Sequence, residues 1–396
     1  MVEVAKIRAG ALLMSALRRP QAIFAALVVS VPLVACASRP ETGFMSPVAV
    51  GAPGAIERTV LVATTRKRDA RPGTLFNGER ASSLSYAKID MSIPPNHVPG
   101  QIEMPDSPPG DPAVHFVVRN ASYLDDDKAF VQALNAQLRK RPKGSRRMFV
   151  FVHGYNTLFA EGVYRISQVA HDAKFDGVPL LFTWASRGEL GDYVYDTNSA
   201  TAARDSLEHV LRLSLASDAD RVDIVAHSMG NWVTVETLRQ MKISGDMRNT
   251  NKIGVTVLAS ADIDLDVFKS QMRRFGQPAK PLYIVTSKDD QALRASKFLA
   301  GERTRVGDDA NAAELAGLGA RVIDLTDVKA DDPMNHSKFT QLAEVAPQLR
   351  EVLARGIAQR HSALAESGAA AGGALGSVVV LPITLVGTPL KIITGE

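Results

Sequence analysis

The stretch Arg221-Val222-Asp223-Ile224-Val225-Ala226-His227-Ser228-Met229-Gly230 joins an apolar run to an abrupt turn of small and polar residues. Residues 231–238 follow with the apolar spacing of a helix. This order predicts a buried strand, a tight turn that carries Ser228, and a helix. A serine held on such a turn, with its hydroxyl exposed, forms a nucleophile elbow. Ala226 replaces the usual first glycine of this motif, and alanine is small enough to be a permitted variant.

The elbow motif also fits an ordinary strand-to-helix connection, so the rest of the chain has to decide between the two. The 396 residues are 45% hydrophobic and 22% charged, which is ordinary for a globular protein with a full-sized core. A formal net charge of +4 is small for this length and gives no reason to expect nucleic-acid binding. Cys36 is the single cysteine of the sequence, so no internal disulfide is possible.

Residues 1–35 have the order of a secretory signal peptide, with basic residues followed by an uncharged apolar run. The run ends in Leu33-Val34-Ala35-Cys36, which resembles the lipobox of bacterial lipoproteins. The resemblance implies cleavage before Cys36 and lipid modification of this residue as the mature N-terminus. Ala37 at the next position implies an outer-membrane anchor facing the periplasm. A plain signal peptide and an uncleaved anchor are the alternatives, and either Met1 or Met14 can be the true start.

Composition and periodicity divide the rest of the chain into three parts. Residues 36–57 are rich in Pro, Gly, Ser and Ala, which predicts a flexible tether. Residues 58–360 contain apolar strand runs that alternate with helical patterns, which predicts an α/β domain with a mostly parallel sheet covered by helices on both faces. A last helix is expected from Ser337 to about Ala358.

Residues 361–396 are expected to form a Gly/Ala-rich apolar tail. Residues 367–390 contain no charged side chain, and glycine recurs every four residues from Gly368 to Gly376. Small residues at that spacing let helices approach closely in membranes, whereas Pro382 and Pro389 argue against one continuous spanning helix. The two interpretations are a membrane contact and a loosely ordered tail folded over the domain.

A nucleophilic serine needs a base that takes its proton and an acid that orients the base. In serine hydrolases built around an elbow on a parallel sheet, the order along the chain is Ser, then Asp or Glu, then His. Two histidines follow Ser228, namely His336 and His361. His361 lies in a charged helix end, whereas His336 lies in a loop after the last predicted strand. We therefore expect His336 to be the base.

Four aspartates compete for the role of the acid. Asp289 and Asp290 directly follow the strand at residues 282–286, and loops at that end of parallel strands line the site. Asp262 and Asp264 follow the preceding strand and form the rival pair. From position alone we favour Asp290, with Asp289 in reserve.

The negative oxygen of the reaction intermediate needs backbone N–H donors. One should come from Met229, directly after the nucleophile, and the other from the loop at His153-Gly154-Tyr155-Asn156, where Tyr155 is the first choice. His153 precedes Ser228 and suits the structure of this loop better than the role of base, and His227 is interpreted as structural. No His-x-x-x-His or cysteine-rich spacing occurs, so the sequence assigns no metal and no cofactor.

Taken in order, these segments resemble a bacterial α/β-hydrolase family of largely unknown function, grouped with esterases and lipases. The resemblance spans about residues 58–358 and is carried by Phe151-Val152-His153-Gly154-Tyr155-Asn156, Phe182-Thr183-Trp184, Ala226-His227-Ser228-Met229-Gly230, Ala261-Asp262-Ile263-Asp264, Ser287-Lys288-Asp289-Asp290-Gln291-Ala292-Leu293 and Asn335-His336-Ser337. The family's Ser-x-x-Asp-x-Ala-Leu motif implies that Asp290, rather than Asp289, is the acid.

The sequence therefore predicts an α/β-hydrolase fold and a membrane-tethered serine hydrolase, an esterase that forms an acyl-enzyme on Ser228. Its expected partners are a small-molecule or lipid ester and the membrane, through lipidated Cys36; the sequence does not determine the oligomeric state. The alternative is a non-catalytic binding protein of the cell envelope that keeps this fold.

Overall fold

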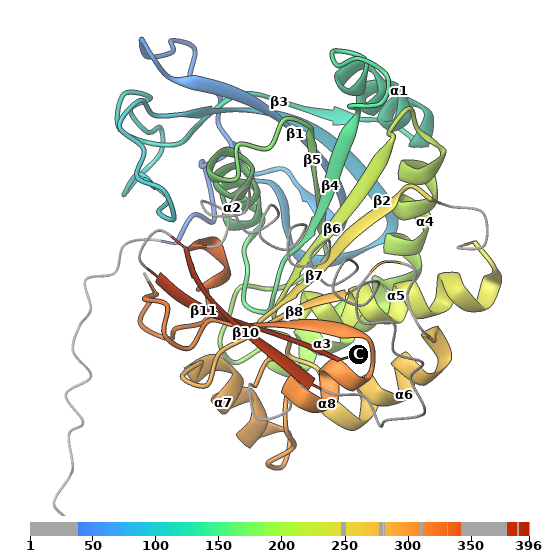
Figure 1. Ribbon diagram of the computed structural model, residues 1–396. Helices are drawn as coiled ribbons and strands as arrows, with labels where there is room; N and C mark the ends of the chain where they lie inside the picture. The colour runs from blue at the N-terminus through green and yellow to red at the C-terminus, as the bar shows by residue number, and fades with distance from the viewer. Residues whose placement is uncertain are drawn as a thin grey trace, which may run out of the picture. The chain divides into compact units, whose positions relative to one another are not determined.

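A computed structural model describes residues 39–246, 251–276, 280, 282–308, 312–330, 332–341, 378–385 and 388–395. The described strands form one eleven-stranded sheet in the order β10-β11-β9-β8-β7-β6-β4-β5-β1-β2-β3 (Figure 1). Their bounds are β1 (Ile56–Asp69), β2 (Leu75–Ile93), β3 (Val117–Leu124), β4 (Arg147–Val152), β5 (Val178–Thr183), β6 (Arg221–His227), β7 (Ile253–Ala259), β8 (Leu282–Thr286), β9 (Ala320–Asp324), β10 (Val378–Leu385) and β11 (Thr388–Gly395).

The central part of the sheet is parallel, from β1 through β5, β4, β6, β7 and β8 to β9. The pairs β1–β2, β2–β3, β9–β11 and β10–β11 are antiparallel. The connecting helices are α1 (Asp127–Leu138), α2 (Phe159–Asp172), α3 (Tyr193–Ala202), α4 (Arg204–Ala216), α5 (Gly230–Ser244), α6 (Leu265–Phe275), α7 (Gln291–Leu299) and α8 (Ala312–Gly317). The predicted α/β-hydrolase class, with a mostly parallel sheet and interleaved helices, is confirmed.

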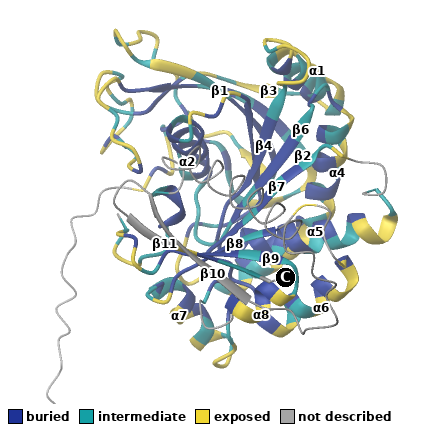
Figure 2. Cartoon of the chain, in the orientation of Figure 1, coloured by how far each residue is buried: buried dark blue, intermediate teal, exposed yellow. Residues whose placement is uncertain are grey.

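Successive side chains of a strand point to opposite faces of the sheet, and β4 shows the result most clearly. Met148, Val150 and Val152 belong to the core that packs under α1, α4, α5 and α6. Phe149 and Phe151 belong to the second core, under α2. Both faces of the central strands are buried, as the dark strands of Figure 2 show. This burial explains why β4 is a continuous apolar run rather than an alternating one.

The segment before β1 differs from the expected flexible tether over residues 36–57. Phe44 and Met45 are buried in the core under α2, with 5% and 2% of their surface exposed. The guanidinium of Arg39 donates to both carboxylate oxygens of Glu161 and to the backbone and side-chain oxygens of Asn156. Because these apolar and polar groups find partners on the domain, residues 39–55 lie against it despite their Pro/Gly-rich composition.

The end of the chain also differs from the expected tail over residues 361–396. Val378–Leu385 and Thr388–Gly395 pair with each other and extend the sheet beyond β9. Both segments are rich in β-branched residues, which favour strands, and they cover an edge that would otherwise be unpaired. The glycine-rich residues 361–377, and most of the helix expected from Ser337 to Ala358, lie outside the described residues.

Within the described ranges, no helix has the length and apolar character that crossing a bilayer requires. The predicted signal peptide at residues 1–35 and the lipidation site Cys36 lie outside the described residues.

Candidate active site

Ser228 occupies the turn between β6 and α5, as the sequence predicts. Its φ is +52°, a left-handed conformation that residues other than glycine rarely adopt and that proteins keep mainly at functional sites. The turn is held from both sides, because the Ser228 N–H donates to Ala259 O and the Ser228 carbonyl accepts from the Asp262 N–H and the Asn231 side chain. These bonds stabilise the strained backbone and fix the direction of the Cα–Cβ bond.

Two glycines allow the elbow to lie close to the end of β4. A Cβ on Gly230 would lie 2.5 Å from the Val152 carbonyl oxygen, so only glycine lets α5 start so near this strand. A Cβ on Gly154 would lie 2.6 Å from the Cβ of Ser228. The loop that follows β4 therefore lies directly against the nucleophile candidate.

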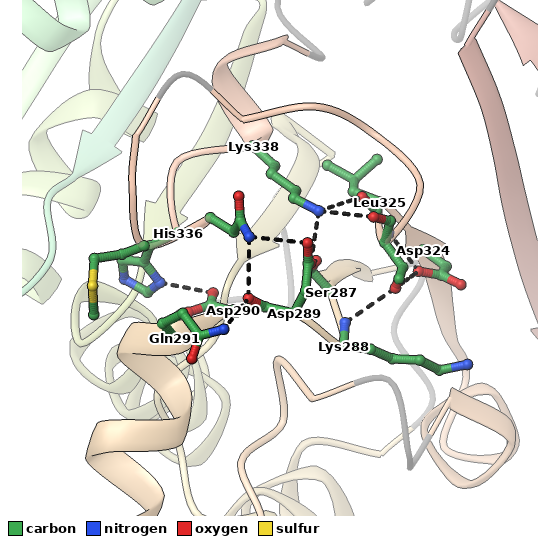
Figure 3. Close-up of polar contacts among 12 residues, drawn as sticks. Ser287, Lys288, Asp289, Asp290, Gln291, Asp324, Leu325, His336 and Lys338 are labelled. Atoms are coloured by element: carbon green, nitrogen blue, oxygen red, sulfur yellow. Dashed lines mark hydrogen bonds and ion pairs between the residues drawn. The ribbon is translucent and has the colours of Figure 1, made fainter.

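Of the candidate acids, Asp290 contacts His336 (Figure 3). Its Oδ2 lies 2.8 Å from Nδ1 of His336, and its Oδ1 accepts the Leu293 N–H and caps α7. The side chain is almost fully buried, so the carboxylate has a single orientation. Burial opposes a charge on His336, but the hydrogen bond that His336 donates to Asp290, together with the negative charges of Asp290, Asp262 and Asp332, raises the pKa of His336 above its ordinary value.

Asp289 faces away from His336 and binds Lys338 instead. The Lys338 ammonium is buried and lies 2.6 Å from Asp289 Oδ1, and it also donates to the carbonyls of Leu325 and Thr326. Asn335 donates its side-chain N–H to the other carboxylate oxygen of Asp289. These contacts join the loop after β8 to the segment that carries His336.

The rival aspartates after β7 have other partners. Asp262 lies 3.2 Å from the guanidinium of Arg305 and accepts hydrogen bonds from Ser296 and Tyr193. Asp264 caps α6 by accepting the N–H groups of Asp266 and Val267. Neither carboxylate forms a hydrogen bond with a histidine in the described part of the chain.

The backbone of His336 is fixed beside the elbow. Its carbonyl accepts hydrogen bonds from Nε2 of His227 and from the Ser260 hydroxyl, and its ring lies 4.6 Å from the His227 ring, centroid to centroid. Asp332 accepts the N–H groups of His336 and Ser337 and shapes the turn. Among the described residues no hydrogen bond joins the Ser228 hydroxyl to His336; in unliganded enzymes this bond is often long and shortens on substrate binding.

The two expected oxyanion donors belong to the elbow and to the loop after β4. Met229 immediately precedes α5, where backbone N–H groups have no partner within the helix. Within the described ranges, neither the Met229 N–H nor the Tyr155 N–H is donated to another protein group. Both N–H groups are thus available to an external acceptor.

The loop after β4 is held by His153, which is buried. Nδ1 of His153 donates to Gly154 O, and Nε2 accepts from the Thr183 hydroxyl. Burial and the nearby charge of Arg66 lower the pKa of His153 to about 3, so the ring is neutral. Trp184 stacks on this ring and donates its indole N–H to His153 O. This geometry agrees with the expectation that His153 shapes the loop.

A buried cation, Arg66, organises the same region from β1. It donates to Thr183 Oγ1, to Ser186 O and to Thr157 O, and burial lowers its pKa to about 10. The strongest opposing charge on Arg66 comes from Asp196, whose carboxylate accepts the Asn156 N–H and the Ser186 hydroxyl. The loop after β4 is therefore held by two buried charged side chains, Arg66 and Asp196.

A cavity of about 710 Å³ lies on the α2 side of the elbow. Its lining includes Gly154 and His227 from the site, Ser337 next to His336, and Ile102 and Met104 from the β2–β3 connection. Apolar and polar groups are mixed in this lining, and the cavity adjoins the elbow through Gly154 and His227, whereas Ser228 and His336 do not line it.

Several residues of this site were missed by sequence reasoning: Arg66, Asp196, Asp332 and Lys338. Asp332 precedes a proline in a turn-forming run, and this signal could have marked it as a turn former. The other three carry no local signal, because their partners lie far away along the chain.

The fold and the elbow define the α/β-hydrolase class. The family model described as "Alpha/beta hydrolase of unknown function (DUF900)" matches residues 126–354, and the chain belongs to this family. No curated protein matches the sequence.

Proposed function

We propose that this α/β-hydrolase is a serine hydrolase that cleaves carboxylic esters through an acyl-enzyme on Ser228. The observation that carries the proposal is the elbow conformation of Ser228, together with the hydrogen bond between His336 and the buried Asp290. Serine is a weak nucleophile unless a base removes its proton, and this arrangement supplies the base and the group that orients it.

Ser228 Oγ attacks the ester carbonyl while Nε2 of His336 takes its proton. Asp290 accepts the Nδ1–H of His336, which keeps the correct tautomer and stabilises the imidazolium that forms. The N–H groups of Met229 and Tyr155 bind the negative oxygen of the tetrahedral intermediate. His336 then gives the proton to the leaving alcohol, and a water molecule, activated in the same way, releases the acid and frees Ser228.

The test is turnover of p-nitrophenyl esters together with labelling by a fluorophosphonate probe. Ser228→Ala should lower kcat by about 10⁴-fold or more and abolish labelling. Ser214→Ala is the matched control, because Ser214 is also buried but bonds a carbonyl inside α4. Folded wild-type protein that neither hydrolyses the esters nor reacts with the probe would favour the non-catalytic binding protein instead.

We also propose that Cys36 carries a lipid anchor and that the domain acts at the periplasmic face of the outer membrane. The order of charge and apolarity in residues 1–35 supports this proposal. Expression of the full chain with a radiolabelled fatty acid should label the wild type and not Cys36→Ala. Equal labelling of both proteins would contradict lipidation at Cys36, and it would leave the hydrolase proposal unaffected.

A further inference from the structure

A cluster of nitrogen and oxygen ligands lies between the β2–β3 connection and the end of α2, outside the hydrolase site. His97, His171 and Asp172 each offer one ligand atom, and these atoms all lie within 4.8 Å of one another. Nε2 of His97 is 2.7 Å from Oδ1 of Asp172. The two histidines are 74 residues apart in the sequence, so no local spacing motif marks the cluster.

The ligand atoms of this cluster are oriented by hydrogen bonds to their other polar atoms. Glu103 lies 2.7 Å from Nδ1 of His97 and so leaves Nε2 directed at the cluster. Oδ2 of Asp172 is bound by the Gly100 N–H and by the Gln168 side chain, which leaves Oδ1 directed the same way. A carboxylate on the distal nitrogen of a metal-bound histidine is a recurrent feature of metal sites.

The ion pair between His97 and Asp172 does not account for the position of the His171 ring. In the described part of the chain its ring nitrogens take no hydrogen-bond partner, and the ring packs edge-on against His97 with centroids 5.2 Å apart. Two imidazoles bound to one Zn²⁺ at about 2.0–2.1 Å and tetrahedral angles have centroids about 5 Å apart. The placement of the two rings therefore suits a shared ion.

We propose that His97, His171 and Asp172 bind one zinc ion, with Glu103 as the group that positions His97. Two imidazoles and one carboxylate are a donor set that Zn²⁺ takes, whereas Mg²⁺ and Ca²⁺ prefer oxygen ligands alone. Coordination places the ligand atoms about 3.4 Å from one another, so Nε2 of His97 and Oδ1 of Asp172, which are now 2.7 Å apart, separate slightly and the half-buried His171 ring moves toward them.

The zinc ion joins two parts of the chain that meet at the cavity lined by Gly154 and His227. His97 and Glu103 flank Gly100 and Ile102, which line this cavity, and α2 contributes Gly162 to the same lining. The ion therefore fixes one wall of the cavity to α2. Its role is structural, and it does not depend on the proposed ester hydrolysis.

The experiment is calorimetric titration of the purified full-length protein, after treatment with EDTA and dialysis, with ZnCl₂ and in parallel with MgCl₂. We expect one Zn²⁺ per chain, no heat from Mg²⁺, and a higher melting temperature with Zn²⁺. His171→Ala should weaken zinc binding at least 100-fold, and Glu103→Gln should weaken it about 10–100-fold.

His209→Ala is the matched control, because His209 also pairs with an aspartate, Asp127, but belongs to no cluster of three ligands among the described residues. Zinc binding by this variant should equal that of the wild type. Absence of zinc binding by the wild type, or equal binding by His171→Ala, would overturn the proposal. Because the His171 side chain forms no hydrogen bond within the described ranges, His171→Ala should keep the circular dichroism spectrum and the melting temperature of the zinc-free wild type.

Discussion

The buried ammonium of Lys338 lies 2.6 Å from Oδ1 of Asp289, and this contact joins the two loops that supply Asp290 and His336. Asp289 precedes Asp290, and Lys338 follows His336 by two residues. The ion pair thus holds the loops of the proposed acid and base together, although neither Asp290 nor His336 is part of the pair. It also occupies Asp289, which leaves Asp290 as the carboxylate that contacts the imidazole (Figure 3).

Lys338→Met should lower the free energy of unfolding by about 2 kcal/mol, because Asp289 Oδ1 and the carbonyls of Leu325 and Thr326 each lose the hydrogen bond from the ammonium. Asp289 is partly exposed, and water therefore limits the loss. Urea denaturation measures the change. Lys128→Met, at an exposed position of α1, should stay within about 0.5 kcal/mol of the wild type. A similar value for both variants would show that the contact contributes nothing.

The pH dependence of ester hydrolysis should follow the protonation of His336. The base acts only when neutral, so kcat/KM should fall as the pH drops through its pKa. The pKa of His336 is raised by Asp290, Asp262 and Asp332 against the effect of burial, so the midpoint should lie above about 6.5. His227 is neutral in this range, because burial and His336 lower its pKa.

Asp290→Asn should shift that midpoint to lower pH and reduce kcat by about 10⁴-fold, because the wrong tautomer of His336 is favoured. Asparagine caps a helix about as well as aspartate, so α7 should stay intact. Asp264→Asn, the same change at the cap of α6, should leave the pH–rate profile in place. A midpoint that does not move in Asp290→Asn would exclude Asp290 as the acid.

Gly154→Ala should inactivate the enzyme, because the new methyl group would lie 2.6 Å from the Cβ of Ser228. The elbow or the oxyanion loop must then move, and small displacements of reacting groups cost about 10²-fold in rate. Gly191→Ala places its methyl group in open space and should be neutral. The measurement is ester turnover by the two variants. Full activity of Gly154→Ala would contradict the close approach of the loop after β4 to Ser228.

Thr183→Val should destabilise the protein by about 1–3 kcal/mol and lower kcat more than it changes KM, because Arg66 loses an acceptor and His153 loses a donor. Thr65 is the matched site on the neighbouring strand β1. Its buried hydroxyl has no hydrogen-bond partner within the described residues, so Thr65→Val should be neutral or slightly stabilising. Melting temperatures and initial rates of both variants are the measurements, and equal values for the two would show that the hydrogen bonds of the Thr183 hydroxyl contribute nothing.

Phe44→Ala should lower the free energy of unfolding by about 3 kcal/mol, because Phe44 is buried against α2. If this segment were a flexible tether, the substitution would leave the free energy of unfolding unchanged. Val50→Ala is the control in the same segment, since Val50 is 76% exposed, and it should change stability by less than about 0.5 kcal/mol. Equal stability of the two variants would restore the tether interpretation for residues 39–55.

The strands and the elbow were predictable because their signals are local. Each central strand is buried on both faces and so reads as an apolar run, and the turn at Ser228 needs small neighbours within two residues. The contacts of the N-terminal segment and the strands at the end of the chain have no such local signal. The composition of these segments resembles that of linkers, and only contacts with Glu161, with the core and with the edge of β9 order them.

The sequence by itself determined the fold class, the position of Ser228 and a short list of aspartates and histidines. Tertiary structure decided which of them meet: Asp290 and His336 are 46 residues apart, and Arg66 and Thr183 are 117 apart. Periodicity and turn chemistry act within a few residues, whereas a hydrogen bond between two loops depends on how the whole sheet orders its strands. The sequence therefore predicted Ser228, Asp290 and His336 as candidates, and the packed sheet brings the side chains of Asp290 and His336 to 2.8 Å from each other.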